Sequence, residues 1–562
     1  MSDKRLNLVC LITIAALAAG VFLPWLGSMT LFDIDETLFA NAAREMGQIG
    51  DYVVPYFNGE AFYDKPPLMY WVMIAGYRVF GVNEMGARIG SALAGIGSCL
   101  LIFVLGKAMF GRAAALIAAV VAATTLMVLV ECRIATADSV LMLTTMLMFL
   151  GFWRVCNGRR RLASWLMLYG GLAAGSLTKG PVSFAVLAVS AAIYAMLRRE
   201  YPTGSRIGAR LKLWWHEMRC VARELHLLIG GAAAMAVVLA WLVPALVATD
   251  GGFITDGFYK HVVARAFSAR AMQGHGGIPV IHYLAILPIA FFPWFAVLPE
   301  SIRRFWGSSG DRGRRAFLVA WAIAPFLLFS FLRTKLPHYT MPAYPALAII
   351  CGWALASPVE RNEGFWKHWL GKAGIITSTV VGVGLAVGLA VFPTVVRWPE
   401  IRVAMLPVAV SLLVLTVAVW PAFVPAGRLR WQPVAGIAAL TVITILLFVG
   451  MAAPAFNGNK MYKSLAREVG TLLRPGDTLA HVGRLEPSLV FYLQRELRPA
   501  ITSEELAGLA RLSPRCICIA EKSKSEIVEE AGGTMLKEGR YFSTRKMKWR
   551  TMTVWEVQNP ER

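Results

Sequence analysis

The chain has 562 residues, of which 57% are hydrophobic and only 16% are charged. A soluble globular protein carries about 25% charged residues, so this composition excludes that class and indicates a membrane protein. The formal net charge of +22 would suggest a nucleic-acid ligand on a soluble protein. In a membrane protein it is typical of the loops that set topology, so no nucleic-acid partner is expected.

Apolar segments of about 20 residues, long enough to cross a bilayer, recur along the chain. The first is interpreted as a retained span because no small-residue cleavage site follows it. Altogether the pattern predicts about thirteen spans. They are expected at residues 6–26, 87–105, 113–130, 140–156, 162–177, 182–197, 225–247, 281–298, 316–332, 339–355, 375–391, 403–420 and 434–451.

Clusters of Lys and Arg fall in alternate connections between these spans. The clusters lie at residues 159–161, 198–223, 303–315, 361–372 and 428–430. Cytoplasmic loops carry the positive excess, so the N-terminus and these connections are expected in the cytoplasm. With an odd number of spans, everything after the last one is expected outside, on the periplasmic face of an inner membrane.

The predicted fold is an α-helical polytopic membrane domain, residues 1–453, followed by a small α/β domain, residues 454–562. Within the latter, residues 460–473 read as a helix, while 478–482 and 516–520 read as strands. Two outer connections, residues 27–86 and 248–280, are unusually long for a helix bundle. In the first of them, residues 36–49 alternate at helical spacing and are expected to lie on the membrane surface.

Three acidic residues, Asp33, Asp35 and Glu36, stand at the mouth of the first span. Carboxylates there are costly unless they meet water, cations or substrate. One of them can cap the amphipathic helix that follows, with Asp33 or Asp35 accepting from free backbone N–H groups. Three acids exceed what a cap requires, so a functional role is expected for Asp35.

Other charged residues of the outer connections are candidates for binding. Pro66 and Pro67 fix an extended backbone after Tyr63, Asp64 and Lys65, although an ordinary surface turn with an ion pair has the same pattern. A short turn carries Glu131, Arg133 and Asp138, and its charges are expected near the membrane surface. Asp138 could cap the next span, orient a sugar, bind a metal or pair with Arg133.

Several cations complete the outer face. Lys179 lies in a tight turn, where snorkelling is the usual explanation for a lysine. The second long connection and a later one supply Lys260, His261, Arg265, Arg270, His275, His282, Arg333, Lys335, His338 and Tyr339. Single members can be interfacial anchors, but cations gathered opposite to the positive-inside trend indicate an anionic ligand, and a lipid phosphate fits best.

The order of these motifs resembles the bacterial aminoarabinose-to-lipid A transferases, within the protein O-mannosyltransferase-like superfamily. The resemblance covers roughly residues 1–350 at the level of motifs. It is carried by Asp35-Glu36-Thr37, Ala43-Arg44-Glu45-Met46, Gly50-Asp51-Tyr52-Val53-Val54-Pro55, Asn58-Gly59, Asp64-Lys65-Pro66-Pro67, Tyr70-Trp71, Ala135 to Asp138, Thr178-Lys179-Gly180 and Lys335-Leu336-Pro337.

The resemblance implies an inverting glycosyltransferase of the GT-C type that uses an undecaprenyl-phosphate-linked sugar on the periplasmic face. Lipid A is the implied acceptor, membrane lipids surround the enzyme, and a monomer is expected. A zinc ion is implied near Asp64 and His261, with aspartate standing where the family usually has glutamate. No nucleotide or redox cofactor is implied. The implied catalytic residues are Asp35, Asp138 and Glu36, and the implied substrate-binding residues are Lys65, Lys179, Arg265, Arg133, Tyr63, Arg270, Lys335 and Tyr339.

The chain departs from the family after Thr37, where Leu38 and Phe39 replace the usual Arg-Tyr. A guanidinium that holds phosphate cannot be replaced by leucine, so another amino sugar, a hexose or another acceptor stays open. A protein or polysaccharide glycosyltransferase of the same fold is one alternative. A lipid-linked-sugar transporter or flippase is another, but it predicts charges near the midplane and discontinuous helices. The notable charges here lie at the outer ends of spans.

Overall fold

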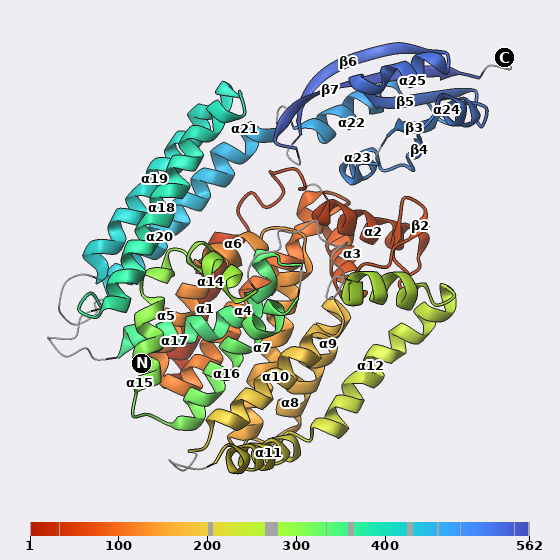
Figure 1. Ribbon diagram of the computed structural model, residues 1–562. Helices are drawn as coiled ribbons and strands as arrows, with labels where there is room; N and C mark the ends of the chain where they lie inside the picture. Colours follow the sequence, from red (N-terminus) through yellow and green to blue (C-terminus); the bar gives the residue numbers. More distant parts are fainter. Residues whose placement is uncertain are drawn as a thin grey trace.

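The computed structural model describes residues 2–32, 34–200, 206–264, 279–332, 334–357, 365–423, 431–457, 460–483, 485–543 and 546–559. A helical bundle forms the larger part, and a small sheet domain sits at one end of it (Figure 1). The N-terminus lies toward the opposite end of the bundle from that domain (Figure 1).

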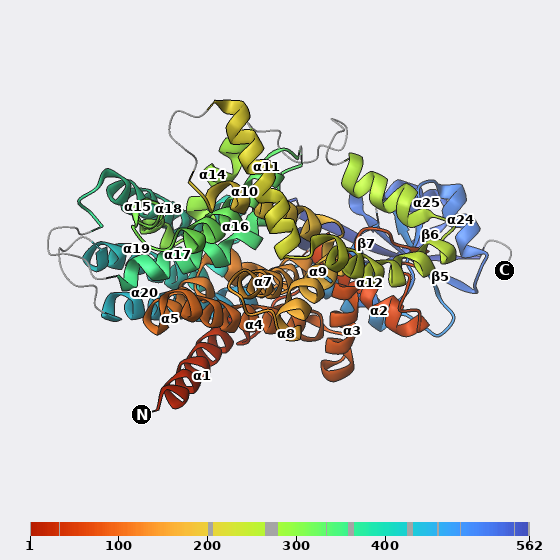
Figure 2. The same ribbon diagram turned by 90° about the horizontal axis from the view of Figure 1, so that it is seen from below.

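Nine helices in the described part of the chain are long and apolar enough to cross a membrane. They are α1 (Asp3–Phe22), α4 (Glu84–Phe110), α7 (Ala137–Cys156), α12 (Leu227–Ala248), α16 (Arg312–Ser330), η5 with α17 (Pro337–Ala343 and Tyr344–Ala356), α18 (Trp369–Val395), η6 with α19 (Pro399–Ile401 and Arg402–Phe423), and α20 with η7 and α21 (Trp431–Leu447, Phe448–Ala452 and Ala453–Asn457). In both views α18, α19 and α20 stand at one edge of the bundle and α12 at the other (Figures 1 and 2).

The other predicted spans fall on shorter or interrupted helices, so the total of thirteen stays a prediction. These are α5 (Arg112–Ala123), α10 (Val182–Leu197), α14 (Pro279–Ala290), and the run α8, η1 and α9 (Leu162–Trp165, Leu166–Gly170 and Gly171–Lys179). The connections add α3 (Leu68–Phe80), α6 (Leu126–Glu131), α11 (Ile207–Glu224), η2 (Phe253–Ala264), η4 (Trp294–Ala296) and α15 (Leu298–Gly307).

Small residues bring α7 against the run from η1 to α9. A Cβ added to Gly151 would lie 2.3 Å from the backbone nitrogen of Leu168, and one added to Gly171 would lie 2.6 Å from that of Met148. Only glycine fits such contacts, which let two helix backbones approach closely in a membrane. This packing holds the start of α7 and the end of α9 side by side.

The first long connection, residues 27–86, folds into α2 (Asp35–Ile49), a short hairpin of β1 (Tyr56–Phe57) and β2 (Glu60–Ala61), and then α3. The helix predicted at residues 36–49 is confirmed. It does not rest on the membrane surface alone, because it packs on α3 and on α23 (Pro487–Leu493) and most of its residues are buried. Its amphipathic pattern therefore reflects burial between two protein layers.

The C-terminal domain is a five-stranded sheet in the order β4-β3-β5-β7-β6. Strands β3 (Thr478–Val482), β4 (Arg498–Ala500) and β5 (Arg515–Glu521) are parallel, while β7 (Lys548–Gln558) is antiparallel to β5 and to β6 (Gly533–Ser543). Helices α22 (Met461–Leu472), α24 (Ser503–Ala510), η8 (Lys522–Lys524) and α25 (Ser525–Glu530) complete it. The two strands predicted from the sequence are confirmed; the boundary at residue 454 stays a prediction.

Side-chain-to-backbone hydrogen bonds fasten the sheet domain to the first long connection. Asn41 donates to the carbonyl of Pro487 at 2.8 Å. The Asn58 amide both donates to the carbonyl of Leu497 at 3.0 Å and accepts from its N–H at 2.9 Å. The domain therefore covers α2 on the side away from the helical bundle (Figure 1).

Candidate active site

Glu36 and Arg88 form a fully buried ion pair beneath the start of α2. The two groups share two contacts, of 2.6 and 2.9 Å. Glu36 also accepts from the backbone N–H groups of Phe32 and Ala135, at 2.7 and 2.8 Å. Burial opposes the charge, but the Arg88 guanidinium and these N–H groups outweigh it and hold the pKa of Glu36 below its ordinary value.

Asp35, the neighbour of Glu36, has the opposite environment. It is the first residue of α2, and the residue at the N-cap is Ile34, with no side-chain cap. The capping role considered for Asp35 is therefore wrong, whereas Asp33 lies outside the described residues. The Asp35 side chain is exposed and has no hydrogen bond or ion pair within the described parts of the chain. Its charge acts on Glu131 and His338 across the site.

Lys65 reaches toward the same place from the connection between β2 and α3. Its ammonium pairs with Asp64 at 2.9 Å and lies 5.3 Å from the centre of the Phe39 ring. Its positive charge also acts on Asp138 and His338. Phe39 itself is buried against Tyr70, edge to face, so the ring is a fixed platform beneath the ammonium.

Asp138 and Lys179 form a second buried pair, at the ends of α7 and α9 that the glycine contacts hold together. The ammonium of Lys179 lies 2.6 Å from the carboxylate of Asp138 and 4.9 Å from the centre of the Tyr339 ring. His338 Nε2 lies 3.7 Å from the other oxygen of Asp138. Pairing with Arg133, one of the options considered for Asp138, is thus replaced by pairing with Lys179.

Glu131 is the second acid that His338 faces. His338 Nδ1 lies 3.5 Å from one Glu131 oxygen, and the Thr136 hydroxyl donates to the other at 2.7 Å. Burial, with a further contribution from the nearby charge of Asp138, raises the pKa of Glu131 to about 8. Glu131 therefore carries a proton at neutral pH.

Glu131 and His338 were noted in the sequence among the charged residues of the connections, but neither was assigned a role of its own. Both had been placed on outer connections, but 207 positions separate them, and no spacing rule links them. Their common feature is that each begins or ends a short helix beside Asp138. A search for all charged residues at those ends of the predicted spans that share one side of the membrane would have found both.

The structure places the remaining predicted site residues apart from this cluster or outside its described parts. Arg133 donates to the carbonyls of Val21 and Pro24, and Lys335 donates to that of Leu332. Tyr63 packs edge to face on Phe253, at 5.1 Å between ring centres. Arg265 and Arg270 lie outside the described residues, as does the side chain of His261.

The implied zinc site is not assembled by the side chains that can be described. Asp64 is engaged with Lys65, and the part of the chain that the structure covers holds no group of three or more His, Cys, Asp or Glu able to bind a metal. A zinc site needs three or four such donors around one point.

An apolar cavity of about 350 Å³ lies against the end of α6 and the turn that follows it. Val130 and Ile134 line it, together with Leu385 and Leu412 from α18 and α19. Its polar surface is small, and Arg88 and Arg133 are the charged residues that border it. Such a cavity suits a hydrocarbon chain.

Known proteins match this chain in sequence and in fold. A family model described as dolichyl-phosphate-mannose-protein mannosyltransferase matches residues 64–207. The undecaprenyl phosphate-alpha-4-amino-4-deoxy-L-arabinose arabinosyl transferase of Edwardsiella ictaluri is 27% identical over 376 residues, which cover 66% of this chain and 63% of that protein. Its counterpart in Serratia proteamaculans is 26% identical and covers 79% of this chain and 76% of that protein.

The crystal structure of ArnT from Cupriavidus metallidurans bound to undecaprenyl phosphate matches with a TM-score of 0.72 and 22% identity, over 97% of both chains. The chain therefore has the fold of that transferase. The predicted resemblance to the aminoarabinose transferases is confirmed. Both the multi-pass membrane bundle and the C-terminal sheet domain agree with this fold.

Proposed function

We propose that this protein transfers a sugar from undecaprenyl phosphate to the phosphate of lipid A at the outer face of the inner membrane. The sugar is 4-amino-4-deoxy-L-arabinose or another amino sugar or hexose. One observation supports this most directly. Asp35, an exposed carboxylate with no partner among the described residues, faces a half-buried cluster that contains Lys65, Lys179 and His338.

The cations of the site would hold the donor. The sugar's anomeric carbon breaks its bond to the phosphate oxygen, and the electron pair stays on undecaprenyl phosphate. Lys65 and Lys179 would stabilise that phosphate as negative charge develops on it. Both ammonium groups are already held in place, by Asp64 and by Asp138, so little reorganisation is required.

Asp35 would act on the side of the acceptor. If the acceptor is a hydroxyl, the carboxylate takes its proton as a general base while the new bond forms to the anomeric carbon with inversion. If the acceptor is a lipid A phosphate, the nucleophile is already an anion. Asp35 then orients the sugar or stabilises positive charge at the anomeric carbon.

The substitution after Thr37 bears on the choice of acceptor. Leu38 supplies no charge, and the Phe39 ring is occupied beneath the Lys65 ammonium. The site therefore offers less positive charge to a second phosphate than the family pattern provides. This favours testing hydroxyl acceptors beside lipid A.

The proposed orientation puts the N-terminus in the cytoplasm and the sheet domain in the periplasm. The positive-inside rule supports it. So does the position of α2, which begins at Asp35 and lies at the same end of the bundle as the sheet domain (Figure 1). The apolar cavity beside Glu131 would receive a prenyl or acyl chain.

The test is a reconstituted transfer assay with radiolabelled undecaprenyl-phosphate sugars and lipid A, with products resolved by mass. Asp35→Asn should lose transfer, whereas Glu504→Gln, an exposed carboxylate on α24, should keep it. If the donor is consumed in an Asp35-dependent way but lipid A stays unlabelled, the protein is a transferase with a different acceptor. Full turnover by Asp35→Asn, or no consumption of any donor by the wild type, would overturn the proposal.

A further inference from the structure

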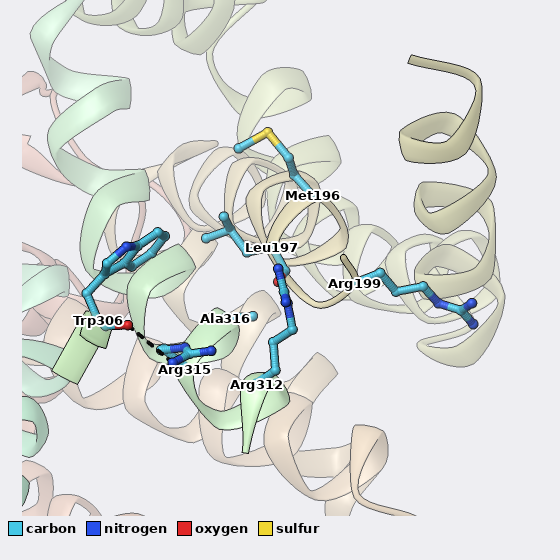
Figure 3. A pocket seen from close by; sticks show the side chains of 7 residues that line it. All are labelled: Met196, Leu197, Arg199, Trp306, Arg312, Arg315 and Ala316. Carbon is cyan, nitrogen blue, oxygen red and sulfur yellow. Dashed lines mark hydrogen bonds between the residues drawn. The ribbon is translucent and has the colours of Figure 1, made fainter. Parts of the chain in front are cut away.

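A second cavity lies at the opposite end of the bundle from the sugar-transfer site. It has a volume of about 360 Å³ and is formed where the end of α10, the end of α15 and the start of α16 meet. Three arginines contribute to its lining: Arg199, Arg312 and Arg315. In Figure 3 the guanidinium groups of Arg312 and Arg315 lie between Trp306 and the end of α10, while Arg199 extends outward.

The positive charge of this cavity is only partly neutralised, because Arg199 is paired with Glu217 at 2.8 Å but the other two arginines are not held by buried carboxylates in the described part of the chain. Arg315 donates to the carbonyls of Trp306, at 3.2 Å, and of Ser308, and within the described residues it has no carboxylate partner. Arg312 pairs with Glu200, whose side chain is 84% exposed and is free to swing away. Backbone carbonyls orient a guanidinium but leave its charge available to an anion.

The flank of the cavity is apolar and faces outward. Met196 is 47% exposed and Trp306 is 56% exposed, although both line a pocket that contains arginines. Trp306 lies on α15, just before the start of the membrane helix α16. Tryptophan at such a position is typical of the boundary between headgroups and hydrocarbon.

The neighbouring helix α11 has the same combination of features. Ile207, Leu211 and Trp215 recur at intervals of four, so they share one face, and all three are exposed. The adjacent face carries cations: Lys212, Arg219 and Arg223. An amphipathic helix with a basic edge lies in the headgroup layer of an anionic membrane.

We propose that this cavity, the basic pocket of Arg312 and Arg315, binds the phosphate headgroup of an anionic phospholipid. The acyl chains would lie along Met196 and Trp306. A freely diffusing anion would need the guanidiniums but not the exposed apolar flank, so the flank favours a lipid. Basic pockets between membrane helices on the positively charged face bind such headgroups. The site is independent of the sugar and of the acceptor.

The test uses the purified full-length protein and measures lipid retention by native mass spectrometry, with phosphatidylglycerol, cardiolipin and phosphatidylcholine offered in turn. The wild type should retain the two anionic lipids and not phosphatidylcholine. The double variant Arg312→Gln/Arg315→Gln should retain about tenfold less, while Arg160→Gln, an exposed arginine elsewhere in a basic connection, should behave as wild type. Equal retention by the double variant would overturn the site.

Two further measurements keep the proposal testable whether or not the double variant folds. A photoactivatable phosphatidylglycerol should label the wild type within residues 306–316, and labelling confined to other segments would contradict the assignment. Millimolar inorganic phosphate should leave lipid retention unchanged. Displacement of the lipid by inorganic phosphate would show a site for a free anion and would overturn the lipid as its ligand.

Discussion

Asp35 and Glu36 are adjacent acids at the start of one helix, yet the fold treats them in opposite ways. Glu36 is buried and is matched by an arginine and two backbone N–H groups. Asp35 is exposed and has no partner in the described structure, although it faces a cluster of buried charges. A carboxylate whose acceptor positions are filled holds the fold together. One that is left open is available to a substrate.

The largest expected effect is the one that separates these two residues by function. Asp35→Asn should lower kcat by about 10²–10⁴-fold, the usual contribution of a positioned acid or base. Its unfolding temperature should stay at the wild-type value, because no contact within the described chain is lost. Turnover with labelled donor and thermal unfolding in detergent measure the two properties. A fall in stability equal to the fall in turnover would make Asp35 another structural residue.

The second-largest expected effect tests the structural role of Glu36. Arg88→Leu should destabilise the protein by about 3–5 kcal/mol, because the Glu36 charge would stay buried without its partner. Adding Glu36→Gln should recover part of that loss, since an amide oxygen can still accept from Phe32 and Ala135 without bearing a charge. Unfolding temperatures of the single and double variants measure this. A double variant less stable than Arg88→Leu alone would contradict the buried-charge argument.

Glu131 differs from both Glu36 and Asp35, because it is buried and its pKa is raised. The folded protein keeps the Glu131 proton up to a pH of about 8, whereas an ordinary glutamate loses it near 4.5. The unfolded state therefore binds fewer protons between these values, so the contribution of Glu131 to stability is full below 4.5 and is lost as the pH rises through 8. Ionised Glu131 would also repel a phosphate near Asp35 and Asp138.

The pH dependence of kcat/KM should show this ionisation. Wild-type kcat/KM should fall about tenfold per pH unit above 8, whereas Glu131→Gln, which imitates the protonated side chain, should match the wild type at pH 7 and lose that inflection. The same inflection in both proteins would assign it to another group.

The sequence predicted the elements well and the contacts between them poorly. Apolar runs indicate where spans lie, and the β-rich segment Thr478–Val482 predicted that strand to the residue. The pairing of Asp138 with Lys179 depends on how closely α7 and α9 pack, which the glycines permit but do not encode as a motif. Likewise, nothing in the sequence around Glu36 predicted its ion pair with Arg88, which lies 52 positions away. Arginine and lysine at span ends looked alike in sequence, and only geometry separated Lys179 from Arg133.

The smallest expected effect concerns the contact between the sheet domain and the connection that contains α2. Asn58 has a φ of 55° and its amide makes both hydrogen bonds to the backbone of Leu497. Asn58→Ala would lose both bonds and leave a non-glycine residue without a polar side chain in the left-handed region, which should cost about 1–3 kcal/mol. Hydrogen exchange of the segment around Leu497 should quicken, while that of α22 stays slow. Asn58→Gly separates the two causes, because glycine relieves the backbone but also removes the amide. If exchange is as fast as in Asn58→Ala, the effect comes from the lost hydrogen bonds. Exchange at the wild-type rate would show that the amide does not fasten the sheet domain to the site.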